Sequence, residues 1–331
     1  MLNLIELFRS LQSIGTIGDG DRFSTTPIPG NEQHRLGKDA QGRPLLLISI
    51  LDVSSPRQPA PIVLEHITVM YNQNCRVSRS DSTFEEGRFT VVRCTGEDTT
   101  LQAYFLRVAS AILISLKDRP TQSDVANAIN RLIELFRAMT KPPRKSVQGL
   151  WAELFLISNA HQPTILVDAW HTVSEDRYDF AMGDQRIEVK SFAGQIRQHH
   201  FSLEQLHPPG GVKTIVASVC VERTQAGESI ADLREKIQGS LSSNSDSLLH
   251  LDTVIALTLG DGWHHASEVR FDSRLAKETL AFYEASAIPS VNPNLPSGVS
   301  YVRFLSDLTK IRTVDISHYR ADGGLFKAAL C

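Results

Sequence analysis

Two acidic side chains and a lysine fall on one face of a predicted hairpin near the middle of the chain. Its turn is Gly183-Asp184, a dipeptide typical of two-residue loops because glycine adopts a positive φ without cost. Apolar and polar residues alternate on both arms, so every second side chain shares a face. With this turn, Asp179 lies directly opposite Glu188, and Lys190 follows two residues further along the same face.

The opposed carboxylates need an explanation, because they repel each other. Residues paired across two strands have Cβ atoms about 4.5–5.5 Å apart. At that spacing and an effective dielectric constant near 20, two carboxylates repel by roughly 3 kcal/mol. A bound divalent cation removes this repulsion, and hard cations such as Mg²⁺ bind oxygen ligands. The alternative is that Asp179 and Glu188 are solvated charges on an outer face, which Lys190 screens.

A third carboxylate comes from an upstream segment that is predicted to be a buried helix. Residues 150–157 are apolar almost all round the helix, and Glu153 is the single charge among them. A lone buried carboxylate is rarely tolerated unless it is paired or binds a metal. We therefore expect Glu153 to lie beside the group formed by Asp179, Glu188 and Lys190.

These residues follow one another in the order helix, strand, strand: Glu153, Asp179 and Glu188-Val189-Lys190. This order resembles the motif of the PD-(D/E)XK nuclease superfamily. The residues around it, 149–154 and 187–191, resemble a prokaryotic family of PD-(D/E)XK proteins, and the resemblance extends over most of the chain. Tyr178 stands where the motif has its nominal proline, a position without a role in the chemistry.

The resemblance implies hydrolysis of phosphodiester bonds with Mg²⁺ or Mn²⁺ as the cofactor. The implied catalytic residues are Glu153, Asp179, Glu188, Lys190 and Gln205. The metal ion would be held by Glu153, Asp179, Glu188 and the backbone carbonyl of Val189. Lys190 would hold the attacking water or the scissile phosphate. Gln205 would contact substrate or water, although a surface glutamine on a short helix is an equally good interpretation.

The expected substrate is DNA, with RNA as an alternative. The resemblance implies a prokaryotic defence or restriction-like system, whose partner proteins choose the target; a second copy of the chain is another candidate partner. The competing hypothesis is a non-catalytic scaffold subunit that retains the nuclease fold. The net charge of −3 favours it, since nucleic-acid-binding domains are usually basic. If the protein binds nucleic acid, its phosphate contacts need local positive charge. The candidate nucleic-acid-binding residues are Lys145, Arg186, Arg197 and His199. Each of them could also be a solvated surface residue.

Cysteine usage and hydropathy bear on the compartment. The four cysteines are scattered without a C-x-x-C pair, which indicates a reducing compartment and no zinc site. The first residues lack the basic region of a signal peptide, and the longest early apolar run, residues 45–51, is too short to cross a bilayer. We expect a cytoplasmic protein without a membrane segment.

A length of 331 residues exceeds one ordinary domain. We expect an α/β (α+β) protein in three parts: a β-rich N-terminal region over 1–118, a helical connector and basic Pro-rich linker over 119–145, and a restriction-endonuclease-like domain with a C-terminal extension over 146–331. In the last part, helices should flank a mixed central sheet.

Hydrophobic periodicity gives the expected elements. In the N-terminal part they are a helix over 4–11, a loop over 15–37, strands over 45–51, 62–70, 75–80 and 89–94, and helices over 99–116 and 121–139. In the C-terminal part they are helices over 146–160, 201–206, 228–241, 247–259 and 274–285, and strands over 164–170, 212–222 and 299–305 beside the hairpin.

Overall fold

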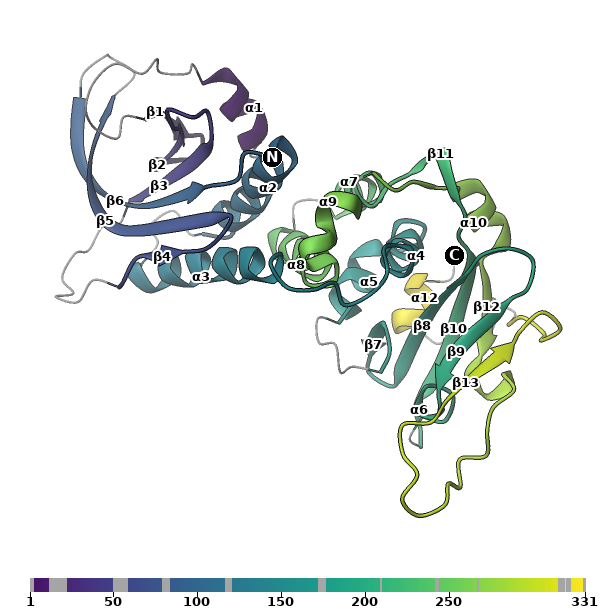
Figure 1. The fold of residues 1–331 in the computed structure, drawn as a ribbon. Coiled ribbons are helices and arrows are strands. Elements are labelled where there is room, and N and C mark those ends of the chain that lie inside the picture. Colours follow the sequence, from purple (N-terminus) through teal and green to yellow (C-terminus); the bar gives the residue numbers. More distant parts are fainter. Residues whose placement is uncertain are drawn as a thin grey trace. The chain divides into compact units, whose positions relative to one another are not determined.

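The computed structural model describes residues 3–11, 23–49, 59–78, 84–116, 121–171, 177–208, 210–241, 244–266, 268–314, 319 and 323–329. The chain divides into two compact units, Met1–Thr140 and Lys141–Cys331 (Figure 1). The boundary falls at the basic, Pro-rich segment. No helix among these residues combines the length and the apolar character needed to cross a membrane.

The first unit is built on an antiparallel sheet in the order β1-β2-β3-β6-β5-β4. Its strands are β1 (Ser24–Ile28), β2 (Asn31–Lys38), β3 (Pro44–Ser49), β4 (Ile62–Val63), β5 (Ile67–Ser78) and β6 (Phe84–Cys94). Its helices are α1 (Leu4–Ser10), α2 (Thr99–Ser115) and α3 (Gln122–Ala138). Helix α3 begins with a capping box in which Thr121 and Asp124 bond each other's backbone N–H.

The loop expected over 15–37 is wrong for its second half, where β1 and β2 form a hairpin. Gly30 takes φ 78° in the connecting turn, which favours glycine. The strands were missed because their residues are mostly polar and do not alternate with apolar ones. Pairing with β3 supplies the stabilisation that the local pattern does not indicate. The remainder of that expected loop lies outside the described residues.

A buried histidine gives the first unit a pH-dependent stability. His34 is fully buried in β2, and its Nδ1 accepts a hydrogen bond from the Ser49 N–H at 3.1 Å. Burial lowers the pKa of His34 to about 4. Because the folded pKa lies below the unfolded value of about 6.5, the contribution to stability is complete above pH 6.5 and is lost towards pH 4.

We expect acidification from pH 6.5 to pH 4 to lower the free energy of unfolding of the first unit by on the order of 3 kcal/mol. The measurement is the free energy of unfolding at a series of pH values, compared with His34→Asn, whose Oδ1 keeps an acceptor for Ser49. The variant should lose much of the slope between pH 6.5 and 4. An unchanged slope would show that another group controls acid sensitivity.

The second unit contains a mixed sheet in the order β12-β10-β8-β7. Strands β8 (Gln185–Phe192) and β10 (Lys213–Cys220) are parallel, whereas β7 (Phe180–Met182) and β12 (Ala281–Glu284) pair antiparallel at the two edges. A second, two-stranded sheet joins β9 (Gln198–Ser202) to β13 (Arg303–Asp307). The remaining strand is β11 (Arg223–Glu228).

Helices α4 and α12 contact β8, and α10 contacts β10. The helices of this unit are α4 (Val147–Ser158), α5 (Pro163–Ala169), α6 (Leu203–Leu206), α7 (Ile230–Ser240), α8 (Ser245–Leu259), α9 (Trp263–Ala266), α10 (Ser273–Thr279), α12 (Gly324–Ala329) and the 3₁₀ turns Gly260–Gly262 and Ala285–Ala287. The mixed α/β architecture, with helices against a mixed sheet, agrees with the expected fold class (Figure 1).

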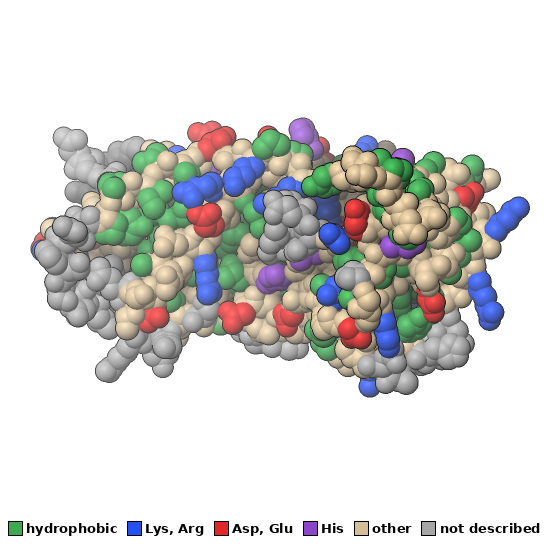
Figure 2. Space-filling view, turned by 90° about the horizontal axis from the view of Figure 1, so that it is seen from below, with side chains coloured by type: hydrophobic (Ala, Val, Ile, Leu, Met, Phe, Trp, Pro, Cys, Tyr) green, Lys and Arg blue, Asp and Glu red, His purple; other side chains and the backbone are tan. Residues whose placement is uncertain are grey.

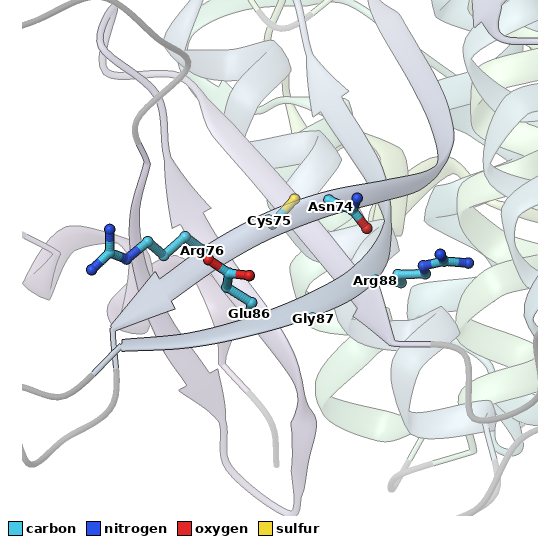
Figure 3. Close-up of a pocket in the computed structure, with 6 residues that line it drawn as sticks. All are labelled: Asn74, Cys75, Arg76, Glu86, Gly87 and Arg88. Atoms are coloured by element: carbon cyan, nitrogen blue, oxygen red, sulfur yellow. The ribbon is translucent and has the colours of Figure 1, made fainter.

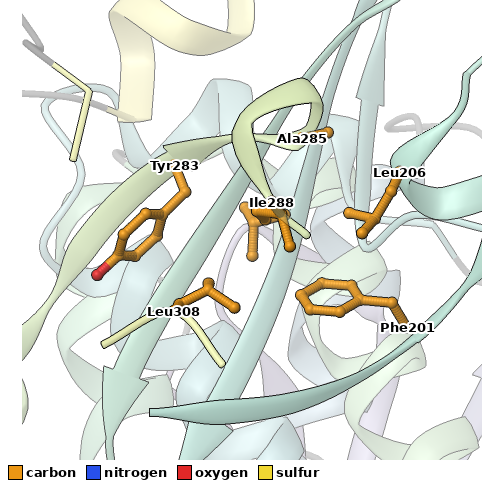
Figure 4. Packing of buried hydrophobic residues seen from close by; sticks show 7 residues of the cluster. Phe201, Leu206, Tyr283, Ala285, Ile288 and Leu308 are labelled. Carbon is orange, nitrogen blue, oxygen red and sulfur yellow. The ribbon is translucent and has the colours of Figure 1, made fainter. Parts of the chain in front are cut away.

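A hydrophobic cluster ties β9 and α6 to the central sheet. Phe201 and Leu206 pack with Tyr283, Ile288 and Leu308 in this cluster (Figure 4). Val216 of β10 belongs to the same cluster and pairs in parallel register with Glu188 of β8. Because paired residues share a face, Glu188 lies on the side of the sheet that this cluster covers.

Two expected elements of the second unit are wrong. Residues 164–170 form helix α5 rather than a strand. Their β-branched residues favoured a strand, but Pro163 occupies the first turn, where a fixed φ suits a helix, and α5 buries Leu166 and Val167. The helix expected over 274–285 ends at Thr279, because Ala281–Glu284 pairs with β10 as an edge strand.

Candidate active site

The hairpin holds its predicted register. Met182 pairs with Gln185 and Phe180 with Ile187, and Gly183 takes φ 53° in the turn. Asp179 is the residue before β7. Its carboxylate oxygen Oδ2 accepts a hydrogen bond from the Val189 N–H at 2.7 Å. This bond fixes the carboxylate beside β8.

Helix α4 carries Glu153 into the interior. Residues 150–157 are all buried, as predicted, and Glu153 itself is only 3% exposed. Its oxygen Oε2 accepts a hydrogen bond from Trp170 Nε1 at 2.8 Å. Trp170 follows α5 and packs on Phe180 of β7, so α5 and the hairpin together orient the Glu153 carboxylate.

Lys145 joins the two acids. Its ammonium lies 2.7 Å from Glu153 Oε1 and 2.5 Å from Asp179 Oδ1. Lys145 immediately precedes Ser146, the N-cap of α4. The sequence predicted that Glu153 and Asp179 would meet, but it did not predict that a lysine would lie between them.

Glu188 forms a second group on β8. Its Oε1 accepts hydrogen bonds from Gln205 Nε2 and lies beside Lys190 Nζ, both at 2.7 Å. Gln205 also donates to the Arg177 carbonyl at 3.0 Å, and the Lys190 ammonium lies 5.4 Å from the centre of the Phe201 ring. Gln205 therefore positions Glu188, which in turn holds Lys190.

The acids ionise unequally. Burial, together with the Asp179 carboxylate, raises the pKa of Glu153 to about 8 and that of Glu188 to about 7. Burial also opposes ionisation of Asp179, but Lys145 and the Val189 N–H outweigh it and hold the pKa of Asp179 below its ordinary value. Burial lowers the pKa of Lys145, but Asp179 and Glu153 more than offset this and raise it. Asp179 and Lys145 are thus a charged pair at neutral pH.

A family model supports the resemblance that these residues suggested. The family described as "Putative PD-(D/E)XK family member, (DUF4420)" matches residues 5–309 of the chain. The chain belongs to this family. No curated protein and no solved structure matches it. The PD-(D/E)XK assignment agrees with the mixed sheet and the surrounding helices, and it covers both units.

Two acids of this PD-(D/E)XK chain direct oxygen atoms towards one another. Glu153 Oε1 and Asp179 Oδ1 face one position, which the Lys145 ammonium holds. Within the described part of the chain, no three His, Cys, Asp or Glu side chains converge as a ready metal cluster. Glu188 instead bonds Lys190 and Gln205. Glu153 and Asp179 therefore supply two converging oxygen atoms, the type of donor that hard cations bind.

Two of the expected phosphate-binding residues, Arg197 and His199, make contacts within the protein instead. Arg197 donates to the Ser218 carbonyl at 2.9 Å and to the Thr279 carbonyl at 2.7 Å, and it stacks on Phe192. His199 is 3% exposed, with Nε2 2.7 Å from Ser218 Oγ.

The expected surface position of His199 is therefore wrong. Burial, together with Lys190 and Arg197, lowers the pKa of His199 to about 3, so the ring is neutral. The alternation of β9 places the His199 side chain inward and that of His200 outward.

The other two candidates have different surroundings. Arg186 is half-buried at the hairpin, and its guanidinium donates to the Gly183 and Gln185 carbonyls at 2.8 and 2.7 Å. Lys145 lies in the acid cluster. On the face shown in Figure 2, Lys and Arg side chains are interspersed with Asp and Glu among the described residues.

Paired residues of β5 and β6 line a pocket of about 460 Å³ in the first unit (Figure 3). Its lining residues are Asn74, Cys75, Arg76, Glu86, Gly87 and Arg88. Burial raises the pKa of the Cys75 thiol, which makes it a weak nucleophile at neutral pH. The pocket contains none of the acids described above, so it does not contribute to the candidate active site.

Proposed function

We propose that the protein is a cytoplasmic, metal-dependent nuclease that hydrolyses phosphodiester bonds, with DNA as the substrate. The PD-(D/E)XK family assignment supports a nuclease. The observation that carries the proposal is the convergence of Glu153 Oε1 and Asp179 Oδ1 on one cation position, next to a strand that bears Glu188 and Lys190.

Each side chain has a distinct role in this proposal. Glu153 and Asp179 would hold the metal ion, with the Val189 carbonyl as a further donor. A bound Mg²⁺ or Mn²⁺ neutralises phosphate charge and lowers the pKa of a coordinated water. The Lys190 ammonium would contact the scissile phosphate or orient the attacking water, where positive charge stabilises the transition state.

Glu188 and Gln205 would support that chemistry. Glu188 is bonded to both Lys190 and Gln205, so it fixes the ammonium in place. The direct Gln205–Glu188 bond favours a site residue over a surface glutamine. Glu188 would also complete the metal ligands if its carboxylate turned from Lys190. Both roles belong to one carboxylate whose pKa, near 7, is tuned by burial and Asp179.

A prokaryotic defence or restriction-like setting is part of the proposal, with partner proteins that select the target. The alternative is a scaffold subunit that keeps the nuclease fold without activity. One observation favours it: the Lys145 ammonium already lies between the two acids that would bind metal. The near-neutral composition, with a net charge of −3, points the same way.

The test is cleavage of supercoiled plasmid and of a structured RNA by the purified protein, with Mg²⁺, with Mn²⁺ and with a chelator. We expect nicking of the plasmid with either metal and none with the chelator. Preferential cleavage of the RNA would show that RNA, and not DNA, is the substrate. No cleavage of either substrate at any metal concentration, with candidate partners added, would favour the scaffold.

A further inference from the structure

Lys145 lies where a metal ion would lie. Its ammonium contacts Glu153 Oε1 and Asp179 Oδ1 at 2.7 and 2.5 Å, and these are the two carboxylate oxygens that converge. Lys145 comes from the segment before α4 and not from the sheet or the helix that carry the acids. The ammonium and a divalent ion would therefore need the same two oxygens.

Each acid is held by a second hydrogen bond, and the lysine is the most exposed of the three side chains. Glu153 uses its other oxygen for Trp170 Nε1 at 2.8 Å, and Asp179 uses its other oxygen for the Val189 N–H at 2.7 Å. The Glu153 and Asp179 side chains are 4% and 7% exposed, whereas that of Lys145 is 39% exposed. The Lys145 side chain is therefore the most exposed of the three.

The charges make the two cations mutually exclusive. A divalent ion at the converging oxygens would repel the Lys145 ammonium at short range. Lysine is a long, flexible side chain whose head group is strongly hydrated in water, so the partly exposed Lys145 side chain can turn towards solvent. In the metal-free protein Lys145 is the counter-ion of the buried Asp179 carboxylate and also bonds Glu153, which gives Lys145 a structural role.

We propose that the Lys145 ammonium and a divalent metal ion are alternative occupants of one position between Glu153 and Asp179. The inference rests on the proposed function, since it assigns regulation to the same site. Lys145 keeps the acids paired and the site closed to substrate chemistry until metal displaces it. Because displacement opposes metal binding, the affinity for metal is lower than the two carboxylates alone would give.

The first experiment is a calorimetric titration of Mn²⁺ into the full-length protein and into Lys145→Met. Methionine keeps much of the side-chain volume and removes the charge. We expect the variant to bind Mn²⁺ at least about tenfold more tightly, and Lys145→Arg to bind as weakly as the wild type. Lys141→Met, an exposed lysine of the same segment, is the matched control and should change nothing.

The outcomes distinguish the proposed metal site from the proposed displacement of Lys145 by metal. Equal or weaker Mn²⁺ binding by Lys145→Met overturns the displacement and leaves the metal site standing. No binding by the wild type or by the variant overturns both the metal site and the displacement. Thermal melting adds a second readout: without metal Lys145→Met should melt below the wild type, and Mn²⁺ should raise its melting temperature by more.

A second experiment uses the unmodified protein, so it does not depend on a variant that folds. Lysines are acylated with an amine-reactive reagent with and without saturating Mn²⁺, and the modified sites are read by mass spectrometry. We expect labelling of Lys145 to rise several-fold with Mn²⁺, while that of Lys141 stays constant. A Lys145 that remains equally protected in the Mn²⁺-saturated protein overturns the inference.

Discussion

Lys190→Met should lower the rate of plasmid cleavage on the order of 10³-fold, equivalent to about 4 kcal/mol of barrier, with little loss of folding. The ammonium lies beside Glu188, 2.7 Å from Oε1, whereas Arg186, the other cation on β8, bonds the carbonyls of the turn. Glu188 can lose its counter-ion at modest cost, because its pKa is already raised to about 7 and it can take up a proton. Initial nicking rates and melting temperatures measure the two effects.

The control for this variant is Lys310→Met, an exposed lysine of the same unit, which should keep full activity. Mn²⁺ affinity should also change little in Lys190→Met, since Lys190 does not contact Glu153 or Asp179. If Lys190→Met cleaves as fast as the wild type, the catalytic ammonium lies elsewhere. A variant that unfolds at room temperature would show that Lys190 mainly stabilises the buried Glu188.

Asp179→Asn should abolish metal-dependent cleavage and weaken Mn²⁺ binding at least about a hundredfold. Mutation of a residue that only hydrogen-bonds a metal ligand already lowers metal affinity by about ten- to a hundredfold, and loss of a ligand should lower it more. The amide removes the negative charge at Oδ1, one of the two oxygens that face the cation position. An amide oxygen can still accept the Val189 N–H, so the β7–β8 hairpin should remain. Cleavage assays and calorimetry provide the measurements.

The matched control is Asp184→Asn, which makes the same change in the exposed turn of the same hairpin. It should leave both activity and metal affinity unchanged. Full activity in Asp179→Asn would contradict the assignment of Asp179 as a ligand. Loss of activity with unchanged Mn²⁺ affinity would assign Asp179 to substrate chemistry and leave the metal to other residues.

The hairpin was predictable because its information is local. Gly183-Asp184 sets the turn, and the turn sets the register that places Asp179 immediately before β7. The burial of Glu153 was predictable as well, because a helix that is apolar all round has no exposed face. Turn chemistry and periodicity therefore located the acids.

The position of Lys145 was not predictable in the same way. It precedes α4, outside any periodic element, and its contact with Asp179 spans 34 residues of sequence. A surface lysine and a lysine that bridges two buried acids have the same local sequence. The contact depends on tertiary packing of α4 against β8, which no local pattern encodes.

The misassigned elements share a related cause. Helix α5 has strand-forming residues, but Pro163 and the packing of Leu166 and Val167 favour a helix. Strand β12 has helix-forming neighbours in α10, but the open edge of β10 pairs with it. In both segments the tertiary environment outweighs a weak intrinsic preference.

The most direct test of the proposed site is an anomalous-difference map from crystals soaked in Mn²⁺ and measured near the manganese absorption edge. The account predicts a peak between Glu153 Oε1 and Asp179 Oδ1, with the Lys145 ammonium moved away from both. A peak bound by other residues, or crystals saturated with Mn²⁺ in which Lys145 still bridges the two acids, would contradict it.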